Sequence, residues 1–258
     1  MNWKQAKTLF IVVFFLTNLC LIYIYVDKVN KSHVNDSEND NAVNFEQEDI
    51  KLPKDMPNVS GVKMQLITGD SHDFEKDVKE DDNAEASKDG FTLTQKMAHA
   101  VNVSQDPISI LKPYINANVY GGSQYQYHET QDGKIIYEQT YDGYPIMNNN
   151  RARLSFDVNG NKTKSYTQST MEDIRPSKGE NNKPRQVISA REAIETLYYN
   201  QYLKAGQSVD SIRLGYYTVV KETNVQVLQA NWEITVSKKG KKHTYYVEAV
   251  SSNPQITE

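Results

Sequence analysis

A long apolar stretch near the start of the chain is followed by alternating and helical patterns. Residues 8–26 form a run of 19 residues without a charged side chain. A helix of this length spans about 28 Å at ~1.5 Å per residue, close to the ~30 Å hydrocarbon core of a bilayer. The run ends in bulky residues, whereas a signal peptidase requires small ones. The pattern therefore predicts an uncleaved transmembrane helix.

The residues that flank this run predict its orientation. Lys4 and Lys7 precede it, and the basic residues that follow it lie beside a strongly acidic stretch. The positive-inside rule then predicts a cytoplasmic tail at residues 1–7 and an extracellular C-terminal domain in the cell membrane. Residues 27–58 lack apolar periodicity and are rich in Asn, Asp, Ser and Glu, so we expect an acidic extracytoplasmic linker there.

In the next part of the chain, segments whose apolar residues recur at every second position alternate with segments whose apolar residues recur about every 3.6 positions. Residues 59–68 alternate as a strand does. A capping-box pattern at Thr92-Leu-Thr-Gln95 predicts a helix that continues to Val101, and Asp106-Pro107 predicts the start of a second helix whose length Pro113 restricts. Alternation bounded by Gly-containing turns then predicts strands at 125–130, 134–141, 151–158 and 162–169.

The last part of the chain repeats this order. Ser189-Ala-Arg-Glu192 is a capping box, and Gly206 is expected to close the helix that follows it. Strands are predicted at 211–220, 226–237 and 242–250. The fold class is therefore α+β: an N-terminal transmembrane helix followed by two similar lobes, residues 59–176 and 177–258, each an antiparallel sheet with a helix on one face.

Composition excludes several kinds of chemistry. The single cysteine, Cys20, lies inside the apolar run, so the soluble part has no disulfide, thiolate nucleophile or Cys-based zinc site. The five histidines have no ligand spacing, and we interpret His128 and Asp132 as surface polar residues because a tetrahedral metal site needs three or four ligands. Phosphate-binding, dinucleotide-binding and nucleophile-elbow motifs are absent from the sequence. We expect no enzyme activity, no cofactor and no metal.

The distribution of charged residues along the chain bears on one further class of function, nucleic-acid binding. Residues 27–90 carry 17 acidic against 8 basic side chains, and residues 91–258 carry 16 against 19. The folded part is thus nearly neutral, which gives no sign of a nucleic-acid surface.

One polar residue stands in the middle of the apolar run. The amide of Asn18 needs a partner in lipid, and a hydrogen bond to another helix is worth ~1 kcal/mol. The alternative is that a single Asn is tolerated without a partner, and the sequence leaves both interpretations open. If there is a partner, the contact face contains the residues at helical spacing around Asn18, namely Ile11, Phe14, Asn18, Leu21, Ile22 and Tyr25.

Tyrosines gather on the strands of the first lobe. A groove for a peptide or a wall polymer is one interpretation, and ordinary strand packing is the commoner one. The residues concerned are Tyr125, Tyr127, Tyr137, Tyr141 and Tyr144.

Six segments spread over the chain resemble one known family. They are Met1-Asn-Trp-Lys-Gln-Ala-Lys-Thr-Leu-Phe-Ile11 followed by Asn18, Asp142-Gly-Tyr-Pro-Ile146, Arg153-Leu-Ser-Phe-Asp-Val158, Ala190-Arg-Glu-Ala-Ile194, Leu214-Gly-Tyr-Tyr217 and Ala230-Asn-Trp-Glu-Ile-Thr-Val236. Together they resemble the YycI family, bitopic accessory proteins of Gram-positive bacteria. The last lobe is also similar, at the level of fold alone, to PepSY-type domains.

The resemblance implies a function by contact rather than by catalysis. It implies that the protein acts with a YycH-type protein beside the sensor histidine kinase WalK (YycG) in the membrane, and that it modulates the WalK/WalR system of cell-wall metabolism. A homodimer is a further possibility. The alternative from a different class is an extracellular binding module for a peptide or a cell-wall polymer.

Overall fold

The computed structural model describes residues 7, 13–18, 21–22, 43–78, 82–222 and 224–258. Much of the predicted membrane segment therefore lies outside the described residues, and those of its residues that are described are helical. Within the described part, no helix is long and apolar enough to cross a bilayer. The chain divides into two compact units, Met1–Val43 and Asn44–Glu258.

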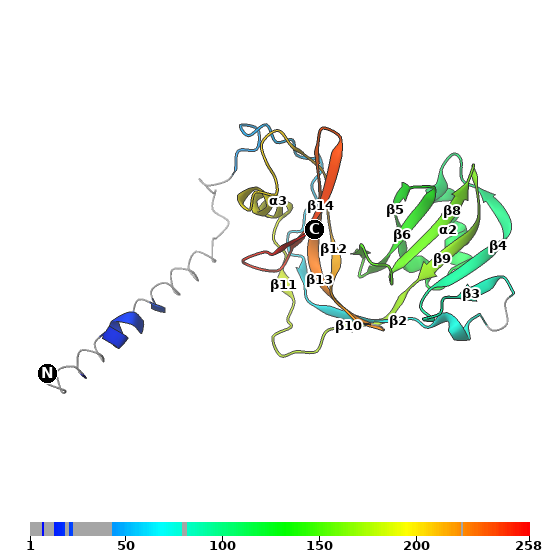
Figure 1. Ribbon diagram of the computed structural model, residues 1–258, viewed down its shortest axis with the longest axis horizontal. Helices are drawn as coiled ribbons and strands as arrows, with labels where there is room; N and C mark the ends of the chain where they lie inside the picture. The colour runs from blue at the N-terminus through cyan, green and yellow to red at the C-terminus, as the bar shows by residue number, and fades with distance from the viewer. Residues whose placement is uncertain (1–6, 8–12, 19–20, 23–42, 79–81, 223) are drawn as a thin grey trace. The chain divides into compact units, whose positions relative to one another are not determined.

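The second unit is an α+β domain that is mostly β, with few helices (Figure 1). Its helices are α2 (Pro107–Asn118) and α3 (Ala190–Tyr199), with short 3-10 turns η1 (Phe74–Lys76) and η2 (Gly122–Gln124). Its strands are β1 (Lys63–Met64), β2 (Ile67–Ser71), β3 (Ala84–Ala86), β4 (Leu93–Asn102), β5 (Tyr125–Gln131), β6 (Lys134–Tyr141), β7 (Tyr144–Met147), β8 (Arg153–Asn159), β9 (Lys162–Ser169), β10 (Met171–Pro176), β11 (Arg185–Gln186), β12 (Ser208–Lys221), β13 (Val225–Lys238), β14 (Lys241–Glu248) and β15 (Ile256–Thr257).

Most of these strands belong to one large mixed sheet, so the expectation of a separate antiparallel sheet in each of residues 59–176 and 177–258 is wrong. Its order is β10-β2-β13-β12-β7-β6-β8-β9-β4-β3, with β5 added beside β6, β14 added beside β13, and β15 added beside β14. We refer to β3, β4, β5, β6, β8 and β9 as the first subsheet, and to β2, β10, β12, β13, β14 and β15 as the second. The short strands β1 and β11 pair only with each other.

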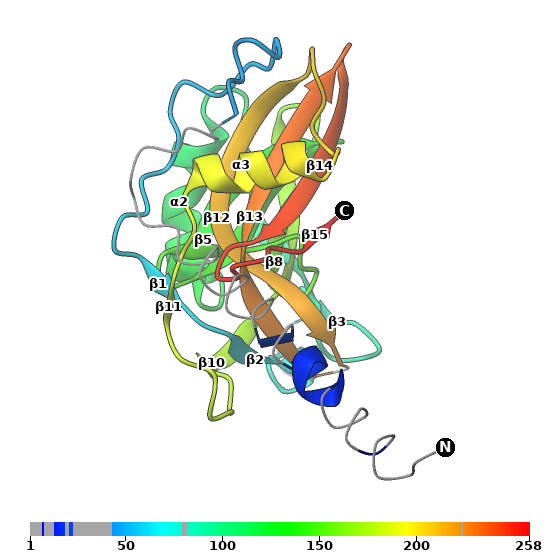
Figure 2. The ribbon, with the colours of Figure 1, turned by 90° about the vertical axis from the view of Figure 1, so that its left-hand side faces the viewer.

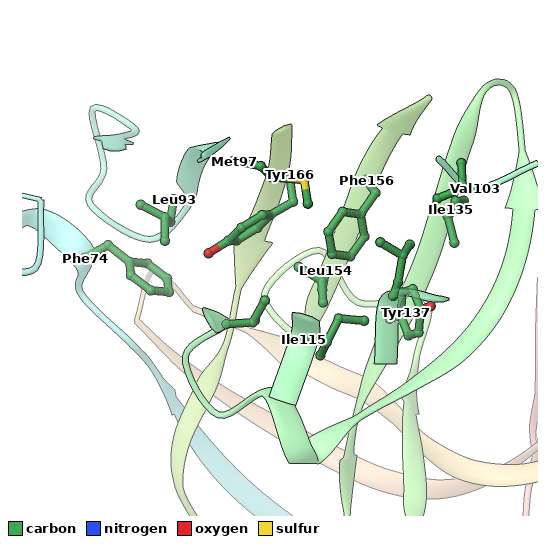
Figure 3. Packing of buried hydrophobic residues seen from close by; sticks show 12 residues of the cluster. Phe74, Leu93, Met97, Val103, Ile115, Ile135, Tyr137, Leu154, Phe156 and Tyr166 are labelled. Atoms are coloured by element: carbon green, nitrogen blue, oxygen red, sulfur yellow. The ribbon is translucent and has the colours of Figure 1, made fainter. Parts of the chain in front are cut away.

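Helix α2 covers one face of the first subsheet. Asp106 caps the helix by accepting a hydrogen bond from the Ser109 amide, and Pro107 occupies the first turn, as the sequence predicts. Pro113 does not end the helix, because burial of Leu111 and Ile115 on the core-facing side offsets the lost backbone hydrogen bond. The core beneath α2 includes Tyr137, Leu154, Phe156 and Tyr166 (Figure 3).

Helix α3 covers one face of the second subsheet and lies across β13 and β14 (Figure 2). Both hydrogen bonds of the predicted capping box are present: the Ser189 side chain accepts from the Glu192 amide, and the Glu192 side chain accepts from the Ser189 amide. The helix ends at Tyr199, several residues before Gly206. Trp232 of β13 is fully buried on this side, and its indole N–H donates to the Ile188 carbonyl at 3.0 Å.

The two subsheets are continuous through β7. This strand forms a hairpin with β6 and runs parallel to β12, where Tyr216 pairs with Ile146. Gly215 makes this approach possible, because a Cβ atom there would lie 2.5 Å from the Pro145 carbonyl oxygen. The chain also crosses between subsheets earlier, since β2 pairs with β13 and β10 although it precedes the first subsheet in sequence.

The segment expected to be a linker is partly folded. Phe45 and Ile50 are buried, and the Phe45 ring meets Tyr198 of α3 edge-on at 6.3 Å. Lys51 forms an isolated bridge with Ser208 at the start of β12. Residues 44–58 therefore belong to the compact unit, and the acidic composition of residues 27–58 concealed a docking segment with few apolar residues.

The helix predicted over residues 92–101 is wrong, because this segment is the strand β4. Leu93 and Met97 are buried on one side of it, and its backbone pairs with β9. The hydroxyl of Thr92, expected to cap a helix, instead lies 2.9 Å from the Ser169 hydroxyl. Pairing with a neighbouring strand overrode the local signal. The strands predicted at 125–130, 134–141, 151–158, 162–169 and 226–237 are confirmed by β5, β6, β8, β9 and β13.

Candidate functional site: a polar cleft between two sheet faces

The faces of the subsheets that carry no helix line a cleft of about 930 Å³. On one wall Glu138 of β6 stands between Gln126 of β5 and Arg153 of β8 in cross-strand register. The other wall is formed by β12, β13 and β14. Because alternate residues of a strand point to opposite faces, the polar residues of these strands face the cleft while their neighbours face the helices.

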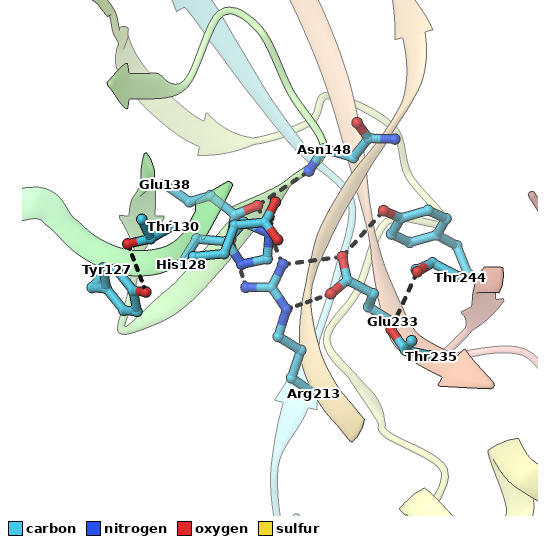
Figure 4. A network of polar contacts seen from close by, with 11 residues as sticks. Tyr127, His128, Thr130, Glu138, Asn148, Arg213, Glu233, Thr235 and Thr244 are labelled. Atoms are coloured by element: carbon cyan, nitrogen blue, oxygen red, sulfur yellow. Dashed lines mark hydrogen bonds and ion pairs between the residues drawn. The ribbon is translucent and has the colours of Figure 1, made fainter. Parts of the chain in front are cut away.

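An ion network joins the two walls of the cleft (Figure 4). The Arg213 guanidinium donates to Glu138 Oε2 through Nη1 at 2.6 Å and to Glu233 Oε1 through Nε at 2.6 Å. Its Nη2 donates to the second oxygen of each carboxylate, at 3.2 Å and 3.0 Å. The Tyr246 hydroxyl donates to Glu233 Oε2 at 3.1 Å. Bidentate pairs of this kind fix both partners in orientation.

The network holds one positive charge, Arg213, against two negative ones. Glu138 and Glu233 are buried, at 1% and 8% exposure. Burial alone lowers the pKa of the Arg213 guanidinium, but hydrogen bonds to Glu233 and Glu138 outweigh it and raise that pKa above its usual value. Burial, together with the adjacent Glu233 carboxylate, raises the pKa of Tyr246. Arg213 therefore stays charged and clamps β6 of the first subsheet to β12 and β13 of the second.

His128 lies beside this network on β5. Its ring nitrogens are 3.7 Å from a Glu138 carboxylate oxygen and 3.5 Å from one of Glu129. Among the described residues, no group of three or more His, Cys, Asp or Glu side chains is arranged to hold a metal ion.

A second polar cluster lies where β2, β10 and η1 meet. His72 Nδ1 is 2.7 Å from Glu172, and its Nε2 is 2.7 Å from Asp77. The imidazole also stacks on the Tyr120 ring at 4.3 Å. Burial lowers the pKa of His72, but the two carboxylates outweigh burial and raise it above 6.5. Nothing in the local sequence indicates this cluster, because Glu172 is one hundred residues from His72.

The predicted partner-binding face is described only in part. Ile11 and Tyr25 lie outside the described residues, whereas Phe14, Leu21 and Ile22 are helical and exposed. The Asn18 amide donates to the Phe14 carbonyl at 2.7 Å, one turn earlier in the same helix. This bond satisfies one donor of Asn18 without another protein, and the face itself stays a prediction.

The tyrosines of the first lobe are packing residues. Tyr137 is buried in the core under α2, and Tyr127 meets it edge-on at 5.8 Å. The Tyr125 hydroxyl donates to the Ser169 carbonyl at 2.9 Å, and Tyr141 packs against Tyr216. Burial raises the pKa of both Tyr125 and Tyr137 to about 12. Four of the five tyrosines of the expected groove therefore contribute to packing.

Fold and site together define a mixed-sheet α+β domain in which Arg213, Glu138 and Glu233 form a polar clamp between two subsheets. The chain matches the family model described as YycI protein over residues 30–250, and it belongs to the YycI family. This is a regulatory, non-catalytic family. The family match confirms the resemblance found in the sequence.

No curated protein matches the chain. Nine chains of solved structures do. One is an uncharacterized protein from Eubacterium rectale ATCC 33656, with 6% identity and a TM-score of 0.45 over 76% of this chain and 87% of that one.

Proposed function

We propose that this chain is a non-enzymatic regulator, anchored in the cell membrane by residues 8–26, that acts with a YycH-type protein on the sensor histidine kinase WalK. The observation that carries the proposal is the family match over residues 30–250. The N-terminus is cytoplasmic and the compact unit Asn44–Glu258 is extracellular, in accordance with the basic residues that precede the apolar run.

Anchoring supports such a role physically. Because the compact unit begins at Asn44, residues 27–43 are what separates it from the proposed membrane segment. A tether of this length holds the domain near the bilayer and raises its effective concentration toward other membrane proteins. Contacts that are weak in isolation then suffice for association.

The first test replaces residues 8–26 with an unrelated apolar helix of equal length. We expect less co-purification with the kinase and an altered output of a WalR-dependent reporter. A finer arm compares Asn18→Leu with Thr17→Leu, whose hydroxyl likewise bonds within the helix, to the Val13 carbonyl at 2.9 Å. Unchanged association and signalling in the replacement would contradict a role for the membrane segment in partner contact.

The competing function, a binding module for a peptide or wall polymer on a tyrosine-rich sheet, is not favoured at that location. Of the tyrosines expected to line a groove, Tyr137 is in the core, Tyr125 and Tyr127 pack against that core, and Tyr141 packs on Tyr216.

A further inference from the structure

His72 follows β2, where the chain crosses from the second subsheet to the first. Its Nδ1 atom lies 2.7 Å from a carboxylate oxygen of Glu172 on β10, in the second subsheet. Its Nε2 atom lies 2.7 Å from a carboxylate oxygen of Asp77, which follows the 3-10 turn η1. The ring also stacks on Tyr120, just beyond the end of α2, with the ring centres 4.3 Å apart. A single imidazole thus connects β10, η1 and the end of α2.

Both of the short contacts to carboxylates are hydrogen bonds only when the His72 ring is protonated. A neutral imidazole carries one N–H donor and one nitrogen lone pair, whereas an ionised carboxylate only accepts. The side chains of Asp77 and Glu172 are 49% and 42% exposed, so water stabilises their charged forms. The imidazolium donates from both nitrogens, and loss of its proton leaves one carboxylate oxygen facing a lone pair at 2.7 Å. That arrangement is repulsive, so one of the two contacts must open.

The charged side chains that contact the His72 ring, Asp77 and Glu172, are both acidic. A third carboxylate, Asp173 of β10, acts with them on the stacked Tyr120, whose pKa is raised by burial and by these three charges. Burial lowers the pKa of His72 itself, but the hydrogen bonds to Asp77 and Glu172 outweigh burial and raise that pKa above 6.5. The other charged residues of β2, η1, β10 and the residues between β2 and η1 are Asp70, Asp73, Glu75, Lys76 and Arg175, of which Asp70 and Arg175 pair at 2.7 Å.

Of the two contacts, the one to Asp77 has less support from the backbone. Glu172 lies within β10, and the ladder between β10 and β2 holds it in place. Asp77 follows a turn of three residues, and the start of this turn is anchored by Phe74, which is 1% exposed. At the end of the turn, the amides of Asp77 and Val78 both donate to the Phe74 carbonyl, at 3.0 Å and 3.3 Å. Release of the Asp77 side chain therefore loosens residues 76–78 while Phe74 stays buried.

We infer that His72 is a proton-operated latch: the imidazolium holds the end of η1, residues 76–78, against β10 and the end of α2, and the neutral imidazole releases it. The latch is closed below about pH 6.5 and opens as the pH rises through the pKa of His72 in the folded state. This face of the domain thereby responds to the pH of the surrounding solution. The inference goes beyond the proposed function, and its test needs neither the kinase nor a YycH-type protein.

The test is amide hydrogen exchange of the full chain in detergent micelles, at about pH 6 and about pH 8. Each rate is divided by the intrinsic rate of the same amide at that pH, which gives a protection factor. We expect protection of the Asp77 and Val78 amides to fall about tenfold at the higher pH, whereas protection within β13 changes less than about twofold. Equal protection of residues 76–78 at both pH values, or a loss that β13 shares, overturns the inference.

Two variants assign the effect to the latch side chains. His72→Gln supplies one neutral donor group and one acceptor, as the neutral imidazole does, so residues 76–78 should be poorly protected at both pH values. Asp77→Asn replaces a pure acceptor by an amide that can donate to the unprotonated ring nitrogen, so protection should persist at about pH 8. The inference is wrong if His72→Gln keeps the pH dependence of the parent, or if Asp77→Asn loses protection as the parent does.

The matched control is His99→Gln, at an exposed position of β4. This variant removes a histidine without changing a residue of the latch, so residues 76–78 should respond to pH as they do in the parent. Loss of the response in this variant would contradict the assignment to His72.

Discussion

Arg213 is a single side chain that two carboxylates from different subsheets share. Its cross-strand neighbour Glu233 lies within the same subsheet, whereas Glu138 belongs to β6. Both carboxylates are buried, so each depends on the guanidinium for its charge compensation.

Removal of this guanidinium should destabilise the domain strongly. Arg213→Ala leaves two buried carboxylates without a cation, and loss of one partner of a buried pair typically costs about 3–5 kcal/mol. Chemical denaturation measures the change. Lys134→Ala is the control, because its cross-strand pair with Asp157 is about half exposed and should cost about 1 kcal/mol or less. A cost for Arg213→Ala no larger than the control would show that the clamp carries little stability.

His72 should make stability depend on pH. Its pKa in the folded state is raised above 6.5, so the protonated imidazole stabilises the fold below about pH 6.5, and this contribution is lost as pH rises through the folded pKa. The stability advantage of the parent over His72→Gln should therefore be largest near pH 6 and smaller at pH 8. Denaturation midpoints at both values measure it, with His99→Gln as the matched control. A difference that grows with pH would contradict the assignment.

Among the secondary-structure elements, the distance between strands β7 and β12 is set by Gly215. A Cβ atom there would meet the Pro145 carbonyl oxygen at 2.5 Å and Met147 Sδ at 2.8 Å, where β7 runs beside β12. A glycine within a strand often marks such a close approach of another backbone.

We expect Gly215→Ala to cost about 1–3 kcal/mol, the usual range for overpacking. Gly69→Ala is a milder comparison within a strand, since its closest contact would be Ile174 Cγ1 at 3.3 Å. Thermal unfolding of both variants measures the difference. Equal stability of the two variants would show that β7 and β12 separate without cost.

At the scale of elements, helices and strands were predicted correctly where the local residue pattern agrees with the packing and strand pairing in the folded protein. The alternating run in β13 and the capping box of α3 are local signals that the fold keeps. The capping pattern at Thr92 failed, because β9 offers Leu93 and its neighbours a ladder of backbone bonds. The ends of β12 and β13 are also longer than alternation alone indicates.

At the scale of the whole molecule, β7 and the Arg213 network connect the two subsheets. Such connections predict that residues 44–258 unfold as one cooperative unit. Leu154→Ala, deep in the first subsheet, should lower stability by about 2–5 kcal/mol. The fluorescence of Trp232, which lies in the second subsheet, should show the same loss of stability when it is measured in a Trp3→Phe background.

The control for cooperativity is Val219→Ala, which is 48% exposed on β12 and should change stability by less than about 0.5 kcal/mol. If Leu154→Ala moved the circular dichroism transition and left the Trp232 transition in place, the subsheets would unfold independently.

The sequence by itself determined the α+β class, the positions of most strands, both α-helix starts in the folded unit and the family. These depend on local periodicity and on short cap and turn motifs, which act over a few residues. Only the tertiary structure decided that β2 joins β13, that residues 44–58 dock, and that Arg213 meets Glu138. Those contacts join residues far apart in the chain, and no local pattern specifies which charged residues of two sheets will face each other.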